Sequence, residues 1–352
     1  MSVSVFDHPW LSPLLGDLEL ARHFTPEAEL HAMLAFEVAL AKAEAAHGVI
    51  PAEAAAAIAR AAPNFKPDMA ALADATARDG MVVPDWVNQL RRAVGAPHEV
   101  HLHHGSTSQD VLDTSLVLRL KPVLGIFDAR LAKLDERLAD LSRKHGGQSL
   151  MAHTRMQQAL PITWADKIAA WRAPLARHRQ RLAELQPRLL VLQFGGPVGT
   201  LETLGDKGPA VTTALARELG LAPADCWHTA RDNLAEFAGW LSLVAGSLGK
   251  IGQDIALLAQ NEIAAVTVTG GGKSSAMHHK TNPVLAEILV TLARYNAAQL
   301  TAMHQALVHE YERSGAAWTL EWMVLPPMVA ATGAALARSL TLLDALVINA
   351  KT

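Results

Sequence analysis

One apolar stripe constrains the fold of this chain more than any other feature. Between residues 232 and 264, apolar side chains recur at alternating spacings of three and four. The stripe consists of Leu234, Phe237, Leu241, Val244, Leu248, Ile251, Ile255 and Leu258. This spacing places them all on one face of an α-helix, as in the seam of a coiled coil. A helix of about 30 residues is ~45 Å long and cannot bury such a stripe alone, so the pattern predicts long neighbouring helices.

Four further segments have the pattern or composition of long helices, namely residues 111–144, 163–190, 283–310 and 316–346. Asn282 is expected to cap the third of these, with Pro283 at its first helical position. Pro174 predicts a kink or break in the second, and Pro326-Pro327 interrupts the last. Five long helical segments in series predict an elongated helical bundle.

The first 109 residues differ from the rest of the chain. Residues 26–47 form one good helical segment, and prolines cut the remainder into shorter pieces. Ala and Leu are abundant, while aromatic residues make up only 5% of the chain, which favours helices. We therefore expect an all-α protein with a small N-terminal helical domain over residues 1–109 and a long-helix bundle domain over residues 110–352.

Charge and cysteine content argue against a nucleic-acid-binding protein and against a disulfide-bonded one. The chain has 31 basic and 34 acidic residues, and its net charge of -3 gives no reason to expect a nucleic-acid partner. Cys226 is the only cysteine, so no intrachain disulfide is possible, and a reducing cytoplasm fits. The N-terminus does not resemble a signal peptide, and no uncharged, unbroken apolar stretch reaches the ~20 residues that span a bilayer. We expect a cytoplasmic protein without a membrane segment.

A first candidate for chemistry is HLHHGSTSQDVLDT, residues 101–114. Hydroxyl groups and free amides at the start of a helix can bind an anion, although Ser and Thr are also the ordinary capping residues there. His101, His103 and His104 permit a metal site, but the spacing signals no further ligand, so no metal is expected.

A second candidate is LMAHTRMQQALPI, residues 150–162. Its Arg155 could hold a carboxylate through two hydrogen bonds, or the segment could be a solvated helix start. The third candidate is GGGKSSAMHHKTNP, residues 270–283. Three glycines suit a mobile lid, and an activated Ser274 would need the help of a nearby cation such as Lys280. A polar loop between helices is the alternative.

In this order, the three segments resemble the signatures of the fumarase/aspartase superfamily, which includes adenylosuccinate and argininosuccinate lyases. GSTSQDVLDT is similar to the first signature, SSAMHHKTNP to the third, and HTRMQ falls where the second is expected. WHTARDNLAEF resembles the start of the family's central helix. FDHPWLSPLLGD and YERSGAAWTLEW resemble the cycloisomerase branch of the superfamily. That branch closes the tricarboxylate 3-carboxy-cis,cis-muconate to 4-carboxymuconolactone in protocatechuate breakdown, part of the β-ketoadipate pathway.

The resemblance implies a role for each matching residue of the third signature. Ser274 corresponds to the family's general acid/base, acting at the carbon next to a carboxylate. Lys280 and Asn282 correspond to residues that bind a carboxylate and stabilise the aci-carboxylate intermediate. Ser275 and Met277 are expected to contact the substrate.

The other two signatures supply binding residues. Thr107 and Ser108 are expected to bind a second carboxylate, with His103 beside them. Thr154 and Gln157 are expected to line the substrate. Glu287 corresponds to the acid that partners a catalytic histidine in many relatives.

The chain also departs from the family pattern. Many relatives carry Thr-His in the second signature, but this chain has Thr154-Arg155, and arginine does not act as a base at neutral pH. We expect Arg155 either to bind the third carboxylate or to pair with Glu287. Lys273 and His278 stand where the family has Gly and Pro. His278 either donates to the substrate or faces solvent. The third, C-terminal domain of relatives is expected to be absent.

The resemblance further implies a homotetramer, in which each active site takes its three signatures from three subunits. It implies no cofactor, metal, nucleic acid or membrane partner. The alternatives are another β-elimination lyase of this fold, such as one acting on a succinyl-purine, and a catalytically inactive structural relative.

Overall fold

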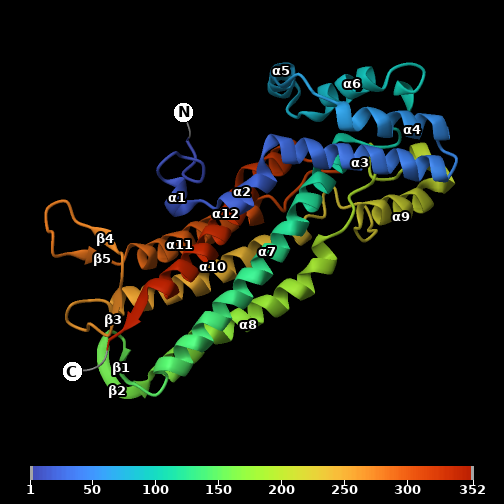
Figure 1. The fold of residues 1–352 in the computed structure, drawn as a ribbon. Helices are drawn as coiled ribbons and strands as arrows, with labels where there is room; N and C mark the ends of the chain where they lie inside the picture. The colour runs from blue at the N-terminus through green and yellow to red at the C-terminus, as the bar shows by residue number, and fades with distance from the viewer. Residues whose placement is uncertain (1–2, 350–352) are drawn as a thin grey trace.

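Five long helices form the body of the molecule (Figure 1). The computed structural model describes residues 3–349. The long helices are α7 (Ser108–His145), α8 (Trp164–Leu189), α10 (Asp232–Leu258), α11 (Val284–Gln305) and α12 (Gly315–Ala345). The stripe of α10 is buried along its whole length, and α10 packs against α8, α11 and α12. The predicted all-α, elongated bundle is therefore confirmed.

A buried arginine ties three of these helices together at one end. Arg231, which precedes α10, donates to Asp113 of α7 at 3.0 Å and to Glu321 of α12 at 2.9 Å. All three side chains are almost fully buried. An arginine placed between two carboxylates donates hydrogen bonds to both where water cannot reach them. Arg231, just before the central helix, thus has a structural role.

The predicted proline breaks and the predicted Asn282 cap were wrong, while a kink at Pro174 stays a prediction. α8 continues through Pro174 and α12 continues through Pro326-Pro327, so these prolines end neither helix. A proline inside a helix costs about 3 kcal/mol, and burial of neighbours such as Trp171 offsets this cost. Asn282 does not cap α11, because it lies in a strand and Pro283 takes the capping position.

Shorter helices pack beside one end of the bundle. They are α1 (Ser12–Leu15), α2 (Leu18–Ala21), η1 (Arg22–Phe24), α3 (Pro26–Ala46), α4 (Ala52–Ala61), η2 (Ala62–Asn64), α5 (Met69–Asp79), α6 (Val83–Val94), η3 (Glu99–His101), η4 (Glu202–Lys207) and α9 (Gly208–Leu219). A second hydrophobic cluster joins α3, α4 and α6 to α9 through Phe36, Trp86 and Leu215. Because α9 comes from the middle of the chain, the division at residue 109 stays a prediction.

Three antiparallel strand pairs connect the long helices. They are β1 (Ser149–Thr154) with β2 (Gln157–Thr163), β3 (Val266–Val268) with β6 (Leu346–Ile348), and β4 (Gly272–Lys273) with β5 (Thr281–Asn282). The first pair joins α7 to α8, and the last pair closes the loop before α11. The β3–β6 pair fastens the segment after α10 to the segment after α12 (Figure 1).

Two of the core helices are apolar enough to resemble membrane spans. By length and composition alone, α10 and α12 could each cross a bilayer. At least half of the most apolar stretch of each helix is buried inside the bundle. Since core helices of helical bundles commonly have this composition, it is weak support for a membrane location.

Candidate active site

The first motif lies where α7 begins. Thr107 caps the helix, and its backbone N–H donates to Asp110 Oδ2 at 3.0 Å, which completes a capping box. Ser108 is the first helical residue, and both hydroxyl side chains are half-buried. Gly105 has φ +64, and a Cβ there would lie 2.8 Å from Leu204 Cδ2. The turn therefore requires glycine, and it presents the hydroxyls at a helix end that favours an anion.

The carboxylate of Asp110 is fully used in holding this motif together. It accepts hydrogen bonds from the backbone N–H of Gly195 and of Gly196, each at 2.9 Å, and lies 2.8 Å from His228 Nε2. Burial alone would lower the pKa of His228, but hydrogen bonds to Asp110 and Cys226 outweigh it and raise that pKa to about 9. The buried pair therefore fixes the glycine-rich loop under the first turn of α7.

His103 is held by a residue that the motifs did not point to. Its Nδ1 lies 2.6 Å from Oε1 of Glu37, a fully buried carboxylate on α3. A sequence signal did exist, because Glu37 and Glu44 stand seven residues apart on one face of a helix rich in Ala and Leu. Burial, followed by the charge of Glu37, raises the pKa of Glu44 to about 9, so Glu44 is a neutral acid at pH 7.

A second residue beside the first motif is Arg313. Its Nε donates to Gln109 Oε1 at 3.2 Å, and its Nη2 donates to the carbonyl of Pro197 at 3.1 Å. The segment that contains Arg313 was recognised only as a branch-specific stretch. The contact brings the segment before α12 next to the first turn of α7.

The second motif forms the tip of an exposed hairpin, so the helix start considered as an alternative is wrong. Thr154 pairs with Gln157 across the turn, and Arg155 and Met156 occupy it with φ +49 and +65. All four side chains are exposed. Positive φ at both central positions matches the turn that best fits the twist of a two-residue hairpin. The guanidinium of Arg155 therefore projects away from its own subunit's core.

The third motif is a loop closed at its base by β4 and β5. Lys273 pairs with Thr281, and Gly272 pairs with Asn282. Inside the loop, Ser274 Oγ accepts a hydrogen bond from the backbone N–H of Met277 at 3.0 Å. Asn282 is half-buried. The other predicted loop residues are exposed, namely Ser275, Met277, His278, His279 and Lys280. Lys273 is thus part of the β4–β5 strand pair, and this pairing restrains the base of the loop.

Within one chain, the first motif lies far from the other two. α7 has 38 residues and a length of ~57 Å, with Ser108 at its start and the hairpin beyond its end (Figure 1). The third motif lies at the start of α11, a helix of 22 residues and ~33 Å. The far end of α11 leads to Arg313, which contacts Gln109 beside the first motif. The first motif is therefore separated from each of the other two by the length of a long helix.

Neither the ion pair nor the metal site considered from the sequence is present within the part of the chain that the structure describes. Glu287, in the first turn of α11, is exposed and forms no ion pair with Arg155 among residues 3–349. Over the same residues, no three His, Cys, Asp or Glu side chains are grouped so that they could hold a metal ion.

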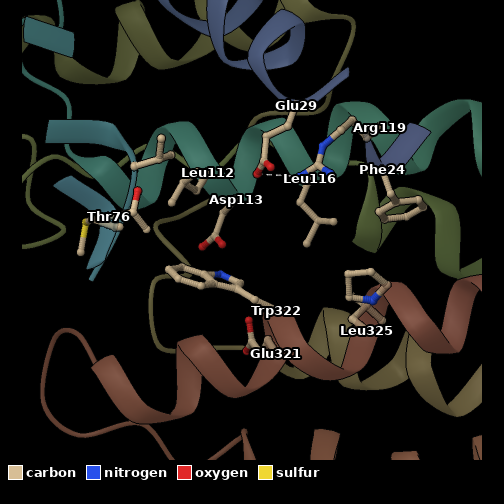
Figure 2. Close-up of a pocket in the computed structure, with 13 residues that line it drawn as sticks. Phe24, Glu29, Thr76, Leu112, Asp113, Leu116, Arg119, Glu321, Trp322 and Leu325 are labelled. Carbon is tan, nitrogen blue, oxygen red and sulfur yellow. Dashed lines mark hydrogen bonds and ion pairs between the residues drawn. The ribbon is translucent and has the colours of Figure 1, made fainter. Parts of the chain in front are cut away.

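A separate cavity of about 310 Å³ lies between α7 and α12 (Figure 2). Its walls are mostly apolar and include Leu112 and Trp322. Arg119 lies in it, bonded to Glu29 at 3.2 Å. None of the predicted site residues lines this cavity. The motifs, rather than this cavity, therefore define the candidate site.

Comparison with known proteins places the chain among lyases and cycloisomerases. A family model described as a lyase matches residues 19–295. The 3-carboxy-cis,cis-muconate cycloisomerase of Pseudomonas aeruginosa is 44% identical over 335 residues, which cover 93% of this chain and 73% of the relative. The solved 3-carboxy-cis,cis-muconate lactonizing enzyme of Pseudomonas putida superposes with a TM-score of 0.91 at 40% identity, covering 97% of this chain and 78% of the other. A fumarate lyase from Mesorhizobium sp. BNC1 gives 0.89 at 36% identity, with 95% and 76% covered.

Proposed function

The chain belongs to the fumarase/aspartase family of lyases, and from this premise we propose that it converts 3-carboxy-cis,cis-muconate to 4-carboxymuconolactone. The observation that carries the proposal is the third motif, in which Ser274, Lys280 and Asn282 belong to one loop closed by β4 and β5. The identity to relatives named for this reaction supports this substrate over a succinyl compound. The reaction belongs to the cytoplasmic breakdown of protocatechuate.

The proposed reaction adds a carboxylate across a carbon–carbon double bond. The attacking carboxylate oxygen forms the C–O bond of the lactone, and the electrons of the double bond move onto the neighbouring carboxylate. The resulting aci-carboxylate is stabilised by the ammonium of Lys280 and the amide of Asn282. Ser274 Oγ then delivers a proton to the carbon beside that carboxylate, which forms the new C–H bond.

A tricarboxylate needs three places for negative charge. Lys280 and Asn282 take the carboxylate at the reacting end. Thr107 and Ser108, with His103 beside them, take the second at the start of α7. Arg155 at the hairpin tip binds the third carboxylate, through two hydrogen bonds from its exposed guanidinium. The other lining residues proposed are Thr154, Gln157, Ser275, Met277 and Glu287.

The site is proposed to assemble in a homotetramer, with one motif from each of three subunits. Support comes from the separation of the first motif from the other two within a single chain, which leaves the first motif without the Ser274 loop. The exposed hairpin and the exposed loop are the elements that would reach neighbouring subunits. A fully active monomer in light scattering would contradict this assembly.

The test is an ultraviolet assay with 3-carboxy-cis,cis-muconate. We expect the absorbance of the conjugated diene to disappear without release of fumarate. Release of fumarate from a succinyl substrate, with no turnover of the muconate, would instead favour another lyase of this fold. No turnover of either substrate would favour the inactive structural relative.

Ser274→Ala tests the assignment of the acid/base. Loss of a general acid or base lowers kcat by ~10²–10⁴-fold. Because Ser274 bonds only within its own loop, thermal melting should not change. His279→Ala, an exposed change in the same loop, is the control and should keep near-normal kcat. Near-normal kcat in Ser274→Ala would remove this residue from the mechanism.

A further inference from the structure

The contact between His103 and Glu37 has a geometry that a purely structural pair would not need. His103 Nδ1 lies 2.6 Å from Glu37 Oε1, while Nε2 has no hydrogen-bond partner among residues 3–349 and is not sealed from solvent. Because a carboxylate accepts, Nδ1 carries the proton of this bond. The imidazole is therefore anchored by one nitrogen and open at the other.

The carboxylate of Glu37 has no other cation to balance it. Its side chain is fully buried, its Oε2 has no partner in the described chain, and His103 is its one ion-pair partner there. A buried carboxylate is strongly unfavourable unless an opposite charge lies against it. Glu37 therefore fixes the ring of His103 through Nδ1 and leaves Nε2 as the nitrogen that can meet a substrate group.

The backbone of His103 also reflects this contact. The residue has φ +61, a left-handed conformation that is unfavourable for any residue with a Cβ. It stands two residues before Gly105 and four before Thr107, the cap of α7. The conformation keeps the ring against α3 while its chain neighbours lead into the first motif.

Resting on the function proposed above, we propose that Glu37 is a positioning residue that holds the ring of His103 for contact with the substrate carboxylate bound at the first motif. The nearby titratable groups are Glu44 on α3, together with His101 and His104 beside His103 in the chain. Glu44 offers a matched comparison, because it lies on the same helix face, is equally buried, and forms no hydrogen bond or ion pair with His103 among residues 3–349.

The experiment compares Glu37→Gln with Glu44→Gln in the muconate assay. Glu37→Gln keeps the shape but removes the charge, so KM should rise roughly tenfold to a hundredfold, the range for a lost charged hydrogen bond. Its kcat should change little, since Ser274 is untouched. Glu44→Gln should leave both constants near wild type, because Glu44 is already neutral at pH 7.

A double-variant cycle separates positioning from a structural role. His103→Gln should raise KM to the same extent as Glu37→Gln, and adding Glu37→Gln to it should cause no further rise. Additive effects, or equal effects of Glu37→Gln and Glu44→Gln, would overturn the inference. An inactive wild type would overturn the proposed function itself. The Glu37 variants test only the role of Glu37 and leave the proposed function standing.

Discussion

His228 Nε2 lies 2.8 Å from Asp110 Oδ1, and both side chains are almost completely buried beneath the first turn of α7. The same carboxylate accepts the backbone N–H groups of Gly195 and Gly196. One imidazole thus links the mid-chain loop to the helix that presents the first motif. Because the link depends on a proton, it makes the stability of the fold depend on pH.

The pKa of His228 predicts the sign of that dependence. Its folded value of about 9 is above the ordinary 6.5, so the pair stabilises the fold fully below pH 6.5 and loses this effect as the pH rises through about 9. We expect the free energy of unfolding to fall over this range, and to fall less in His228→Gln. Denaturant midpoints at fixed protein concentration measure this. If the fall persists in Cys226→Ala, it belongs to the His228–Asp110 pair and not to the thiol; identical slopes in wild type and His228→Gln would refute the assignment.

Glu44 predicts a variant that is more stable than wild type. Its carboxyl group is buried, and neither oxygen has a partner among residues 3–349. The folded pKa of about 9 exceeds the ordinary 4.5, so ionisation of the unfolded state weakens the fold progressively as the pH rises from 4.5 to 9. Glu44→Gln cannot ionise and should unfold at higher denaturant concentration at pH 7, with the gain shrinking towards pH 4.5. A gain that does not vary with pH would point to packing instead.

The long helices could be predicted because their pattern is local. The stripe of α10 repeats over 27 residues, and every turn of the helix carries the same signal. The hairpin could not be predicted, because its turn residues are Arg155 and Met156 where such a turn usually has Asn and Gly. The Glu37–His103 contact joins residues 66 apart, and no local pattern encodes that distance. The motif residues themselves were recognised by resemblance, and their roles remain predictions.

Arg155 allows a test in which loss of the guanidinium does not damage the turn. Asn adopts a positive φ more readily than Arg, so Arg155→Asn should leave the hairpin intact or slightly more stable. If the guanidinium binds a carboxylate, KM for the muconate should rise roughly tenfold to a hundredfold, as for other charged hydrogen bonds. Met156→Asn changes the same turn but keeps the guanidinium, and its KM should be unchanged. Equal KM values in both variants would show that Arg155 does not bind substrate.

The proposed sharing of each site between subunits predicts that two inactive variants can restore each other's activity. Ser274→Ala damages the third motif, and the double change Thr107→Val with Ser108→Ala damages the first, which lies a long helix away in the same chain. In tetramers co-assembled from both chains, roughly a quarter of sites would take both motifs from undamaged subunits if mixing is random. Muconate turnover should therefore return in the mixture, well above that of either parent. Mixing Ser274→Ala with Lys280→Met gives no such rescue, because both changes lie in one loop and every site receives one of them. Equal activity of the two mixtures would mean that each site is built within a single subunit, and it would overturn the proposed assembly.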